Sequence, residues 1–177
     1  KQLVNRILEP FMWHTAIITA TEWNNFFSQL CHPDAQPEME ALAVAIQEAF
    51  IGEEPEPLDY GQFHTPYITN YERAECVRMA EGTVYTPEQL EMMVSIARCA
   101  RVSYLNHDGK RDLEKDLELF SKLLTGQHFS PFEHVATPCA HLDTNCPYQG
   151  NFKGFDQYRK FLPNENRTER TNNYVKR

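Results

Sequence analysis

The segment from His128 to His134, with the sequence HFSPFEH, places two imidazoles, a hydroxyl and a carboxylate within seven residues. An imidazole titrates near neutral pH, so it can bind a ligand or move a proton there. The segment follows a predicted helix, and Pro131 restricts its backbone. We therefore expect a compact loop that displays these groups to a ligand. The pattern is equally typical of a plain turn in which Ser130 caps and both histidines are solvated.

A second interpretation of this region uses a metal ion. Cys139, His141 and Cys146, together with His134, supply thiolate and imidazole groups of the kind that bind zinc. Their spacing matches no standard zinc finger or knuckle. Cys139 also alternates on a predicted strand as a core residue does, so we favour a structural role for it.

Two helices are predicted to flank this loop on its N-terminal side. The first helix is predicted to begin at Thr86-Pro87-Glu88-Gln89 and to run to about Ala100. Thr86 can cap it, Pro87 suits its first position, and Gln89 completes a capping box with Thr86. A second helix spans about 112–125, and Gly126 ends it. Its apolar positions fall on one face: Leu113, Leu117, Phe120 and Leu124.

The first fifty residues indicate a strand and further helices. Residues 1–9 are typical of the end of a helix that Pro10 stops, and 14–20 form a β-branched run that predicts a strand. Thr19 and Glu22 have capping-box spacing for a helix to Leu30. A helix from about Pro37 to Phe50 has its apolar residues on one face: Met39, Leu42, Ala43, Ile46, Ala49 and Phe50.

The remaining segments are less regular. Prolines and glycines in 52–75 indicate a long irregular connection, which we extend to residue 85. Residues 101–105 are extended in character, 135–142 predict a strand, and the rest is polar and rich in turns. Helices packed on a small sheet predict a mixed α+β fold in one domain over 1–177.

Composition limits the classes of function. The chain has 177 residues, of which 41% are hydrophobic, and no apolar run approaches the ~20 residues of a membrane helix. A net charge of −8 disfavours nucleic-acid binding, although the end from Lys153 to Arg177 is locally basic. The five cysteines are scattered and odd in number, which favours a reducing, cytoplasmic location: Cys31, Cys76, Cys99, Cys139 and Cys146. Because the chain begins at Lys1 in apparent mid-helix, we expect upstream residues.

Two blocks of sequence resemble the flavin-dependent thymidylate synthases. HFSPFEH, preceded by ARCARVSY at 97–104, is similar to the N-terminal half of that family, where the loop contacts the flavin. This resemblance implies that His128, Ser130 and Glu133 bind FAD. NRILEP at 5–10, WNNFF at 23–27 and AQPE at 35–38 are similar to the family's C-terminal half.

The second block implies further site residues. By that match, Arg6 contacts the nucleotide and Asn25 the flavin. A guanidinium suits phosphate, which it binds through two parallel hydrogen bonds. The two blocks cover about two-thirds of the chain in rearranged order: 1–51 resembles the family's C-terminal half, 52–85 connects, and 86–165 resembles its N-terminal half.

The chain departs from the family pattern at three points. The signature run R-H-R-x-x-S-x-N-E-x-S-x-R is present only as a partial likeness, QYRK at 157–160 followed by PNENR at 163–167, which makes Gln157 and Arg159 candidate substrate ligands. Leu30 occupies the position of an arginine thought to polarise the uracil ring, and leucine cannot stabilise developing negative charge. No glycine-rich phosphate cradle is present.

The resemblance implies a reductive methylation of dUMP to dTMP. Methylenetetrahydrofolate supplies the carbon, FAD carries the chemistry and NADPH reduces it, in sites formed between the subunits of a homotetramer. An alternative from another class is a non-catalytic module that binds flavin or nucleotide, or serves as a structural subunit, having lost the signature run.

Overall fold

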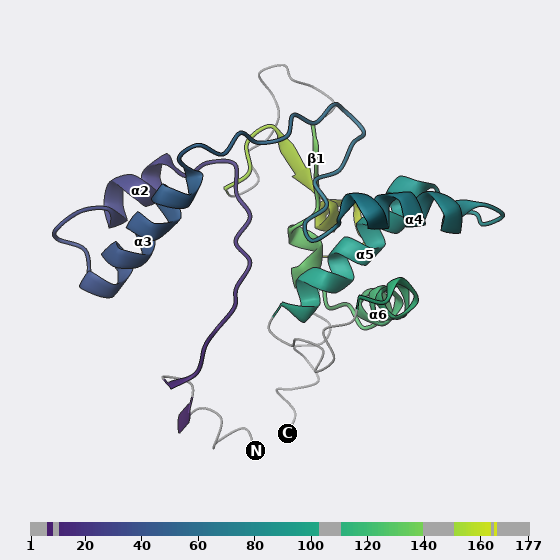
Figure 1. Cartoon of the computed structure of the whole chain (residues 1–177), viewed down its shortest axis with the longest axis horizontal. Coiled ribbons are helices and arrows are strands. Elements are labelled where there is room, and N and C mark those ends of the chain that lie inside the picture. The colour runs from purple at the N-terminus through teal and green to yellow at the C-terminus, as the bar shows by residue number, and fades with distance from the viewer. Residues whose placement is uncertain (1–6, 9–10, 103–110, 140–150, 164, 166–177) are drawn as a thin grey trace.

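The computed structural model describes residues 7–8, 11–102, 111–139, 151–163 and 165 (Figure 1). Within them, five α-helices and a two-stranded antiparallel sheet form a mixed α+β structure. The helices are α2 (Asn24–Leu30), α3 (Pro37–Phe50), α4 (Asn70–Ala80), α5 (Pro87–Arg101) and α6 (Leu113–Thr125). Helices α2 and α3 form a hairpin that lies apart from the group of α4, α5 and α6 in Figure 1.

The predicted helices α3, α5 and α6 are confirmed, and local interactions or residue types explain where each of them begins. At the start of α5, the Thr86 hydroxyl accepts a hydrogen bond from the Gln89 amide, while the Gln89 side chain accepts one from the Thr86 amide. Asp112 caps α6 through the amide of Lys115. Helix α3 begins at Pro37, whose missing N–H costs nothing in the first turn.

Helix α4 corrects the prediction of an irregular connection over 52–85. Thr69 and Glu72 form a complete capping box that begins it. Its sequence has little apolar periodicity, because Glu72, Arg73 and Arg78 take positions in ion pairs rather than in an apolar stripe. The segment from Glu53 to Leu58 is irregular, as predicted.

The N-terminal predictions are wrong in two details. Residues 14–20 form no strand, since they have no ladder partner within the described part of the chain. Helix α2 exists, but Trp23 is its N-cap and no side chain caps it. The Thr19 hydroxyl, expected to cap, shares a hydrogen bond with Nδ1 of His134 instead. The predicted helix over 1–9 lies mostly outside the described residues, of which Ile7 and Leu8 are helical.

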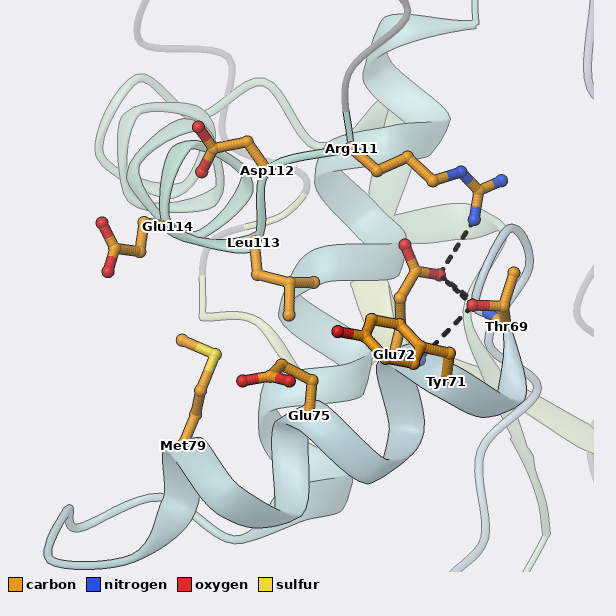
Figure 2. Close-up of a pocket in the computed structure, with 9 residues that line it drawn as sticks. All are labelled: Thr69, Tyr71, Glu72, Glu75, Met79, Arg111, Asp112, Leu113 and Glu114. Carbon is orange, nitrogen blue, oxygen red and sulfur yellow. Dashed lines mark hydrogen bonds and ion pairs between the residues drawn. The ribbon is translucent and has the colours of Figure 1, made fainter.

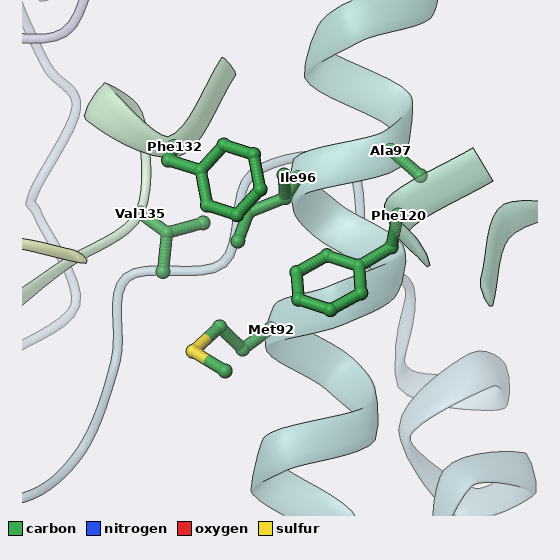
Figure 3. Packing of buried hydrophobic residues seen from close by; sticks show 6 residues of the cluster. All are labelled: Met92, Ile96, Ala97, Phe120, Phe132 and Val135. Carbon is green, nitrogen blue, oxygen red and sulfur yellow. The ribbon is translucent and has the colours of Figure 1, made fainter. Parts of the chain in front are cut away.

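The hydrophobic core lies where α5 meets α6 and the HFSPFEH segment (Figure 3). Phe132 is completely buried, and its ring centroid lies 5.5 Å from that of Phe120 on α6. The other buried members of this cluster are Met92, Ile96, Ala97 and Val135. The apolar face predicted for α6 is partly confirmed: Phe120 is buried, whereas Leu124 is 38% exposed.

The sheet is small and holds only short strands. Strand β1 (Ala136–Pro138) pairs with β2 (Phe155–Gln157), so that Ala136 faces Gln157 and Pro138 faces Phe155. His64 adds a single bridge to Ala136. The strand predicted over 135–142 is thus confirmed at β1, and its end lies outside the described residues. Of the predicted extended segment 101–105, only 101–102 are described, and Arg101 is helical.

In the described part of the chain, no helix has the length and apolar character needed to cross a membrane. Cys31, Cys76 and Cys99 carry free thiols, whereas Cys139 is disulfide-bonded. The chain is therefore not fully reduced, although one such bond is no disulfide framework.

Candidate active site

The HFSPFEH segment is a turn anchored by its second phenylalanine. Residues Ser130–Glu133 form a short 3-10 helix, η2, in which Phe132 points into the core. Gly126 allows the chain to reverse before it, because a Cβ there would lie 2.8 Å from the Lys122 carbonyl oxygen and 2.9 Å from Cδ2 of His128. The amide of His128 then donates to the Leu123 carbonyl at 2.9 Å. This anchoring leaves His128 and Ser130 exposed on the surface.

Glu133 joins the turn to the C-terminal part of the described chain. Its carboxylate accepts a hydrogen bond from Nη1 of Arg159, in the 3-10 helix η3 (Tyr158–Phe161). Its carbonyl accepts one from Nε2 of Gln157 at 3.2 Å. The amide of Tyr158 donates to the Val135 carbonyl at 2.7 Å, which continues the sheet contact beside these side chains.

Two carboxylates balance two cations in this cluster. Nε of Arg159 donates to Glu165 at 2.8 Å, and the Lys160 ammonium lies 2.8 Å from the other oxygen of Glu165. The hydrogen bonds from Lys160 and Arg159 lower the pKa of Glu165, and the bond from Lys160 has the larger effect. The bonds to Glu133 and Glu165 fix the plane of the Arg159 guanidinium. An anionic ligand that bound Arg159 would therefore compete with these carboxylates.

His134 has a structural role beside the cluster. Its Nδ1 lies 3.1 Å from the Thr19 hydroxyl, and its carbonyl accepts a hydrogen bond from Nδ1 of His64 at 3.1 Å. Burial lowers its pKa; the nearby Glu133 carboxylate opposes this shift and His64 adds to it. His134 is thus a neutral connector between the turn, the N-terminal segment and the connection before α4.

The structure brings together some of the predicted site residues and separates others. Glu133, Gln157 and Arg159 are in contact, and Ser130 lies on the same 3-10 turn as Glu133. Asn25 is exposed on α2, in the hairpin that lies apart from this turn (Figure 1). Arg6 lies outside the described residues.

The structure does not support the zinc interpretation. Cys139 is disulfide-bonded and so cannot act as a thiolate ligand. His141 and Cys146 lie outside the described residues, and among those described there is no group of three potential metal ligands. His134 already shares its Nδ1 with Thr19.

Sequence reasoning missed a buried ion network centred on Arg98. Its guanidinium lies 2.7 Å from Glu72 and 3.0 Å from Asp116, and Nη1 donates to the Tyr67 carbonyl at 2.8 Å. Arg101 also bonds to Asp116. All three members of the central trio Glu72, Arg98 and Asp116 are buried. The only sequence signal was the spacing of Thr69 and Glu72.

One end of this network borders a surface pocket of about 610 Å³ between α4 and the start of α6. Figure 2 shows Glu72 between Thr69 and Arg111, whose Nη1 lies 2.9 Å from the Glu72 carboxylate. Burial opposes ionisation of Glu72, but the hydrogen bonds from Arg98 and Thr69 outweigh it and lower its pKa to about 2. Both oxygens of the Glu72 carboxylate are paired with these partners. The network therefore holds α4, α5 and α6 together and does not present a charge to a ligand.

The groups left available on the turn fit a flavin in their chemistry. No described residue hydrogen-bonds to the Ser130 hydroxyl or to the His128 ring, and both are exposed. A hydroxyl both donates and accepts, and a neutral imidazole does so through its two nitrogens, which suits the polar edge of the isoalloxazine ring. Ser130 and His128 are therefore the residues of this turn that could hold a flavin.

Comparison with known proteins finds no matching family model, no matching curated protein and no matching solved structure. The likeness to flavin-dependent thymidylate synthases therefore rests on the two sequence blocks alone.

Proposed function

We propose that the chain is a flavin-dependent thymidylate synthase that converts dUMP to dTMP. In this proposal methylenetetrahydrofolate supplies the carbon, and NADPH reduces the FAD. The observation that supports it most is the contact of Glu133 with Gln157 and Arg159. The contact joins residues 128–134, which resemble the family's flavin loop, to residues 157–160, which resemble part of its signature run.

Each residue of the cluster takes a role suited to its chemistry. Ser130 and His128 bind the flavin, which supplies the hydride chemistry when bound. Gln157 and Arg159 bind the nucleotide, since an amide reads the uracil edge and a guanidinium binds phosphate. Glu133 orients the Arg159 side chain, and the phosphate would compete with Glu133 and Glu165 for the guanidinium.

Assembly accounts for the residues that lie apart in one protomer. Asn25 is exposed on α2, in the hairpin that lies apart from α4, α5 and α6 in Figure 1. In the proposed homotetramer, Asn25 meets the flavin held by another subunit, so the isolated protomer is inactive. Arg6 acts on the nucleotide in the same proposal.

A second candidate is a non-catalytic flavin- or nucleotide-binding module. Leu30, at the end of α2, favours it, because a leucine donates no hydrogen bond to a uracil carbonyl. In this alternative the cluster at Glu133 still binds its ligands, but no turnover follows.

Formation of dTMP separates the two candidates. Purified protein is incubated with dUMP, methylenetetrahydrofolate, NADPH and FAD, and dTMP is measured by chromatography, with Arg159→Ala as the negative control. We expect dTMP that depends on FAD. If the wild type binds FAD but forms no dTMP, and the Leu30→Arg variant does form dTMP, the chain is the non-catalytic module. If both the wild type and Leu30→Arg bind FAD and neither forms dTMP, the proposed enzyme is contradicted.

We also infer a cytoplasmic location and no nucleic-acid partner. The net charge of −8 and the free thiols of Cys31, Cys76 and Cys99 support this inference. The disulfide at Cys139 is evidence against the cytoplasmic location.

A further inference from the structure

A cavity of about 420 Å³ lies where the base of the α2–α3 hairpin meets the sheet. Four stretches of the chain build it: the extended segment before α2, the connection after α3, strand β1 and the segment around β2. Its walls include Ile18, Thr19, Trp23, Phe50, His64 and Phe152. None of the candidate flavin or nucleotide ligands named above lines it.

Trp23 gives this cavity an aromatic wall that is held in place. Its indole N–H donates to the Ala20 carbonyl at 3.0 Å, so its one polar atom is satisfied. The ring is stacked on Phe27, with centroids 5.9 Å apart, and tilted against Phe50 at 5.0 Å. These contacts hold the Trp23 ring at the wall of the cavity, where an aromatic side chain can stack on a planar ligand.

The polar groups of the cavity are few, and His134 orients two of them, Thr19 and His64. Nδ1 of His64 lies 3.1 Å from the His134 carbonyl oxygen, to which it can only donate, so Nε2 is the ring nitrogen left to accept a hydrogen bond from a ligand. The Thr19 hydroxyl is fixed by the His134 ring. The described lining contains no lysine or arginine, and Glu56 is its one carboxylate. Such a lining accepts hydrogen bonds from an uncharged ring and repels phosphate.

We propose that this cavity binds an uncharged, planar nitrogen heterocycle that stacks on Trp23 and donates a hydrogen bond to Nε2 of His64. Any phosphate or carboxylate tail of the ligand lies outside the cavity. The proposal rests on the proposed function only for the two natural sources of such a ring, a flavin and the pterin of a reduced folate. Because His134 ends the HFSPFEH turn, the ring would lie beside the cluster at Glu133.

The two tryptophans of the chain provide a matched test. Trp13 is fully exposed, whereas Trp23 lines the cavity. In the Trp13→Phe variant, emission comes from Trp23 alone; in Trp23→Phe it comes from Trp13 alone. Each is titrated with riboflavin, which has the flavin ring without phosphate, and with tetrahydrofolate, and emission is corrected for absorption by the probe. Circular dichroism confirms that both variants are folded.

We expect saturable quenching of Trp23, by twofold or more, and no saturable quenching of Trp13. Quenching by riboflavin alone assigns the flavin ring to the cavity and contradicts its proposed placement at Ser130 and His128. Quenching by tetrahydrofolate alone assigns the cavity to the pterin. His64→Phe removes the acceptor and should weaken binding at least tenfold; Ile18→Phe, at a 60% exposed position of the wall, should weaken it by narrowing the cavity. Binding unaffected by both variants would overturn the proposal.

The result is separable from the proposed function. If FAD and dUMP bind together while neither probe quenches Trp23, the cavity proposal is wrong and the enzyme proposal stands. If a probe quenches Trp23 while FAD and dUMP do not bind together, the cavity binds a heterocycle in a protein that is no thymidylate synthase.

Discussion

The guanidinium of Arg159 donates a hydrogen bond to the carboxylate of Glu133, 26 residues earlier in the chain. Glu133 is the last residue of the 3-10 helix η2, which Phe132 anchors in the core, and Arg159 follows the second strand of the sheet. The contact therefore adds an ion pair between η2 and η3 to the strand pairing that already joins these segments. It gives the proposed nucleotide ligand Arg159 one orientation, and gives Glu133 a positioning role.

Replacement of Arg159 by alanine should weaken dUMP binding at least tenfold. A hydrogen-bonded charge is worth about 1.5–3 kcal/mol, which corresponds to roughly ten- to hundredfold in affinity. Arg159→Lys should recover little, because an ammonium lacks the planar fork. Isothermal titration of dUMP into FAD-loaded protein measures this. Lys122→Ala, which removes a 76% exposed charge on α6, is the control; equal effects of the two variants would refute a site at Arg159.

The buried network at Arg98 should dominate the stability of the α4–α6 group. Arg98→Met leaves the carboxylates of Glu72 and Asp116 buried without this partner, which costs about 3–5 kcal/mol. Arg78→Ala breaks an exposed pair with Glu75 and should cost less than about 1 kcal/mol. Urea unfolding measures both variants. A similar small loss in both would mean that the network contributes nothing beyond a surface pair.

Glu72 makes stability depend on pH below 4.5. Its pKa in the folded chain is about 2, against an ordinary value of 4.5, so the unfolded chain binds more protons between these values. The stabilisation, about 3 kcal/mol, is therefore complete above pH 4.5 and is lost as pH falls toward 2. The difference in unfolding free energy between the wild type and Glu72→Gln should be largest near pH 6 and shrink below pH 4.5. A difference independent of pH would contradict this assignment.

The turn depends on the core through Phe132. Phe132→Ala should destabilise the chain by about 3–5 kcal/mol, because the side chain is fully buried among Phe120, Phe129 and Tyr158. Phe161→Ala, at a 55% exposed position, should cost less than about 1 kcal/mol. Thermal unfolding measures both. Equal losses would show that Phe132 is no anchor.

The elements predicted correctly are those whose signals are local. Helices α5 and α6 begin at capping residues whose partners lie three positions away, and α3 begins at a proline. Helix α4 carried a similar box at Thr69, but its face is built for ion pairs, and apolar periodicity does not reveal such a face. A capping signal was thus present at Thr69 and was missed.

What the sequence could not reveal are partnerships across long separations. Thr19 has capping-box spacing with Glu22, yet its hydroxyl bonds to His134, 115 residues away. Strand β2 has three residues, too few for an alternating pattern, and is defined by its pairing with β1. The same holds for the candidate site. The sequence indicated Glu133 and Arg159 separately, but their contact depends on the pairing of β1 with β2.

The visible absorption spectrum of the purified protein, recorded with FAD before and after addition of dUMP, tests the proposed function most directly. Ser130 and His128 lie on the HFSPFEH turn, and Arg159 lies on η3, which contacts that turn through Glu133. We therefore predict a bound-flavin spectrum that changes on addition of dUMP, and loss of that change in Arg159→Ala. Failure of the wild type to take up flavin at high FAD concentration would contradict the proposed function.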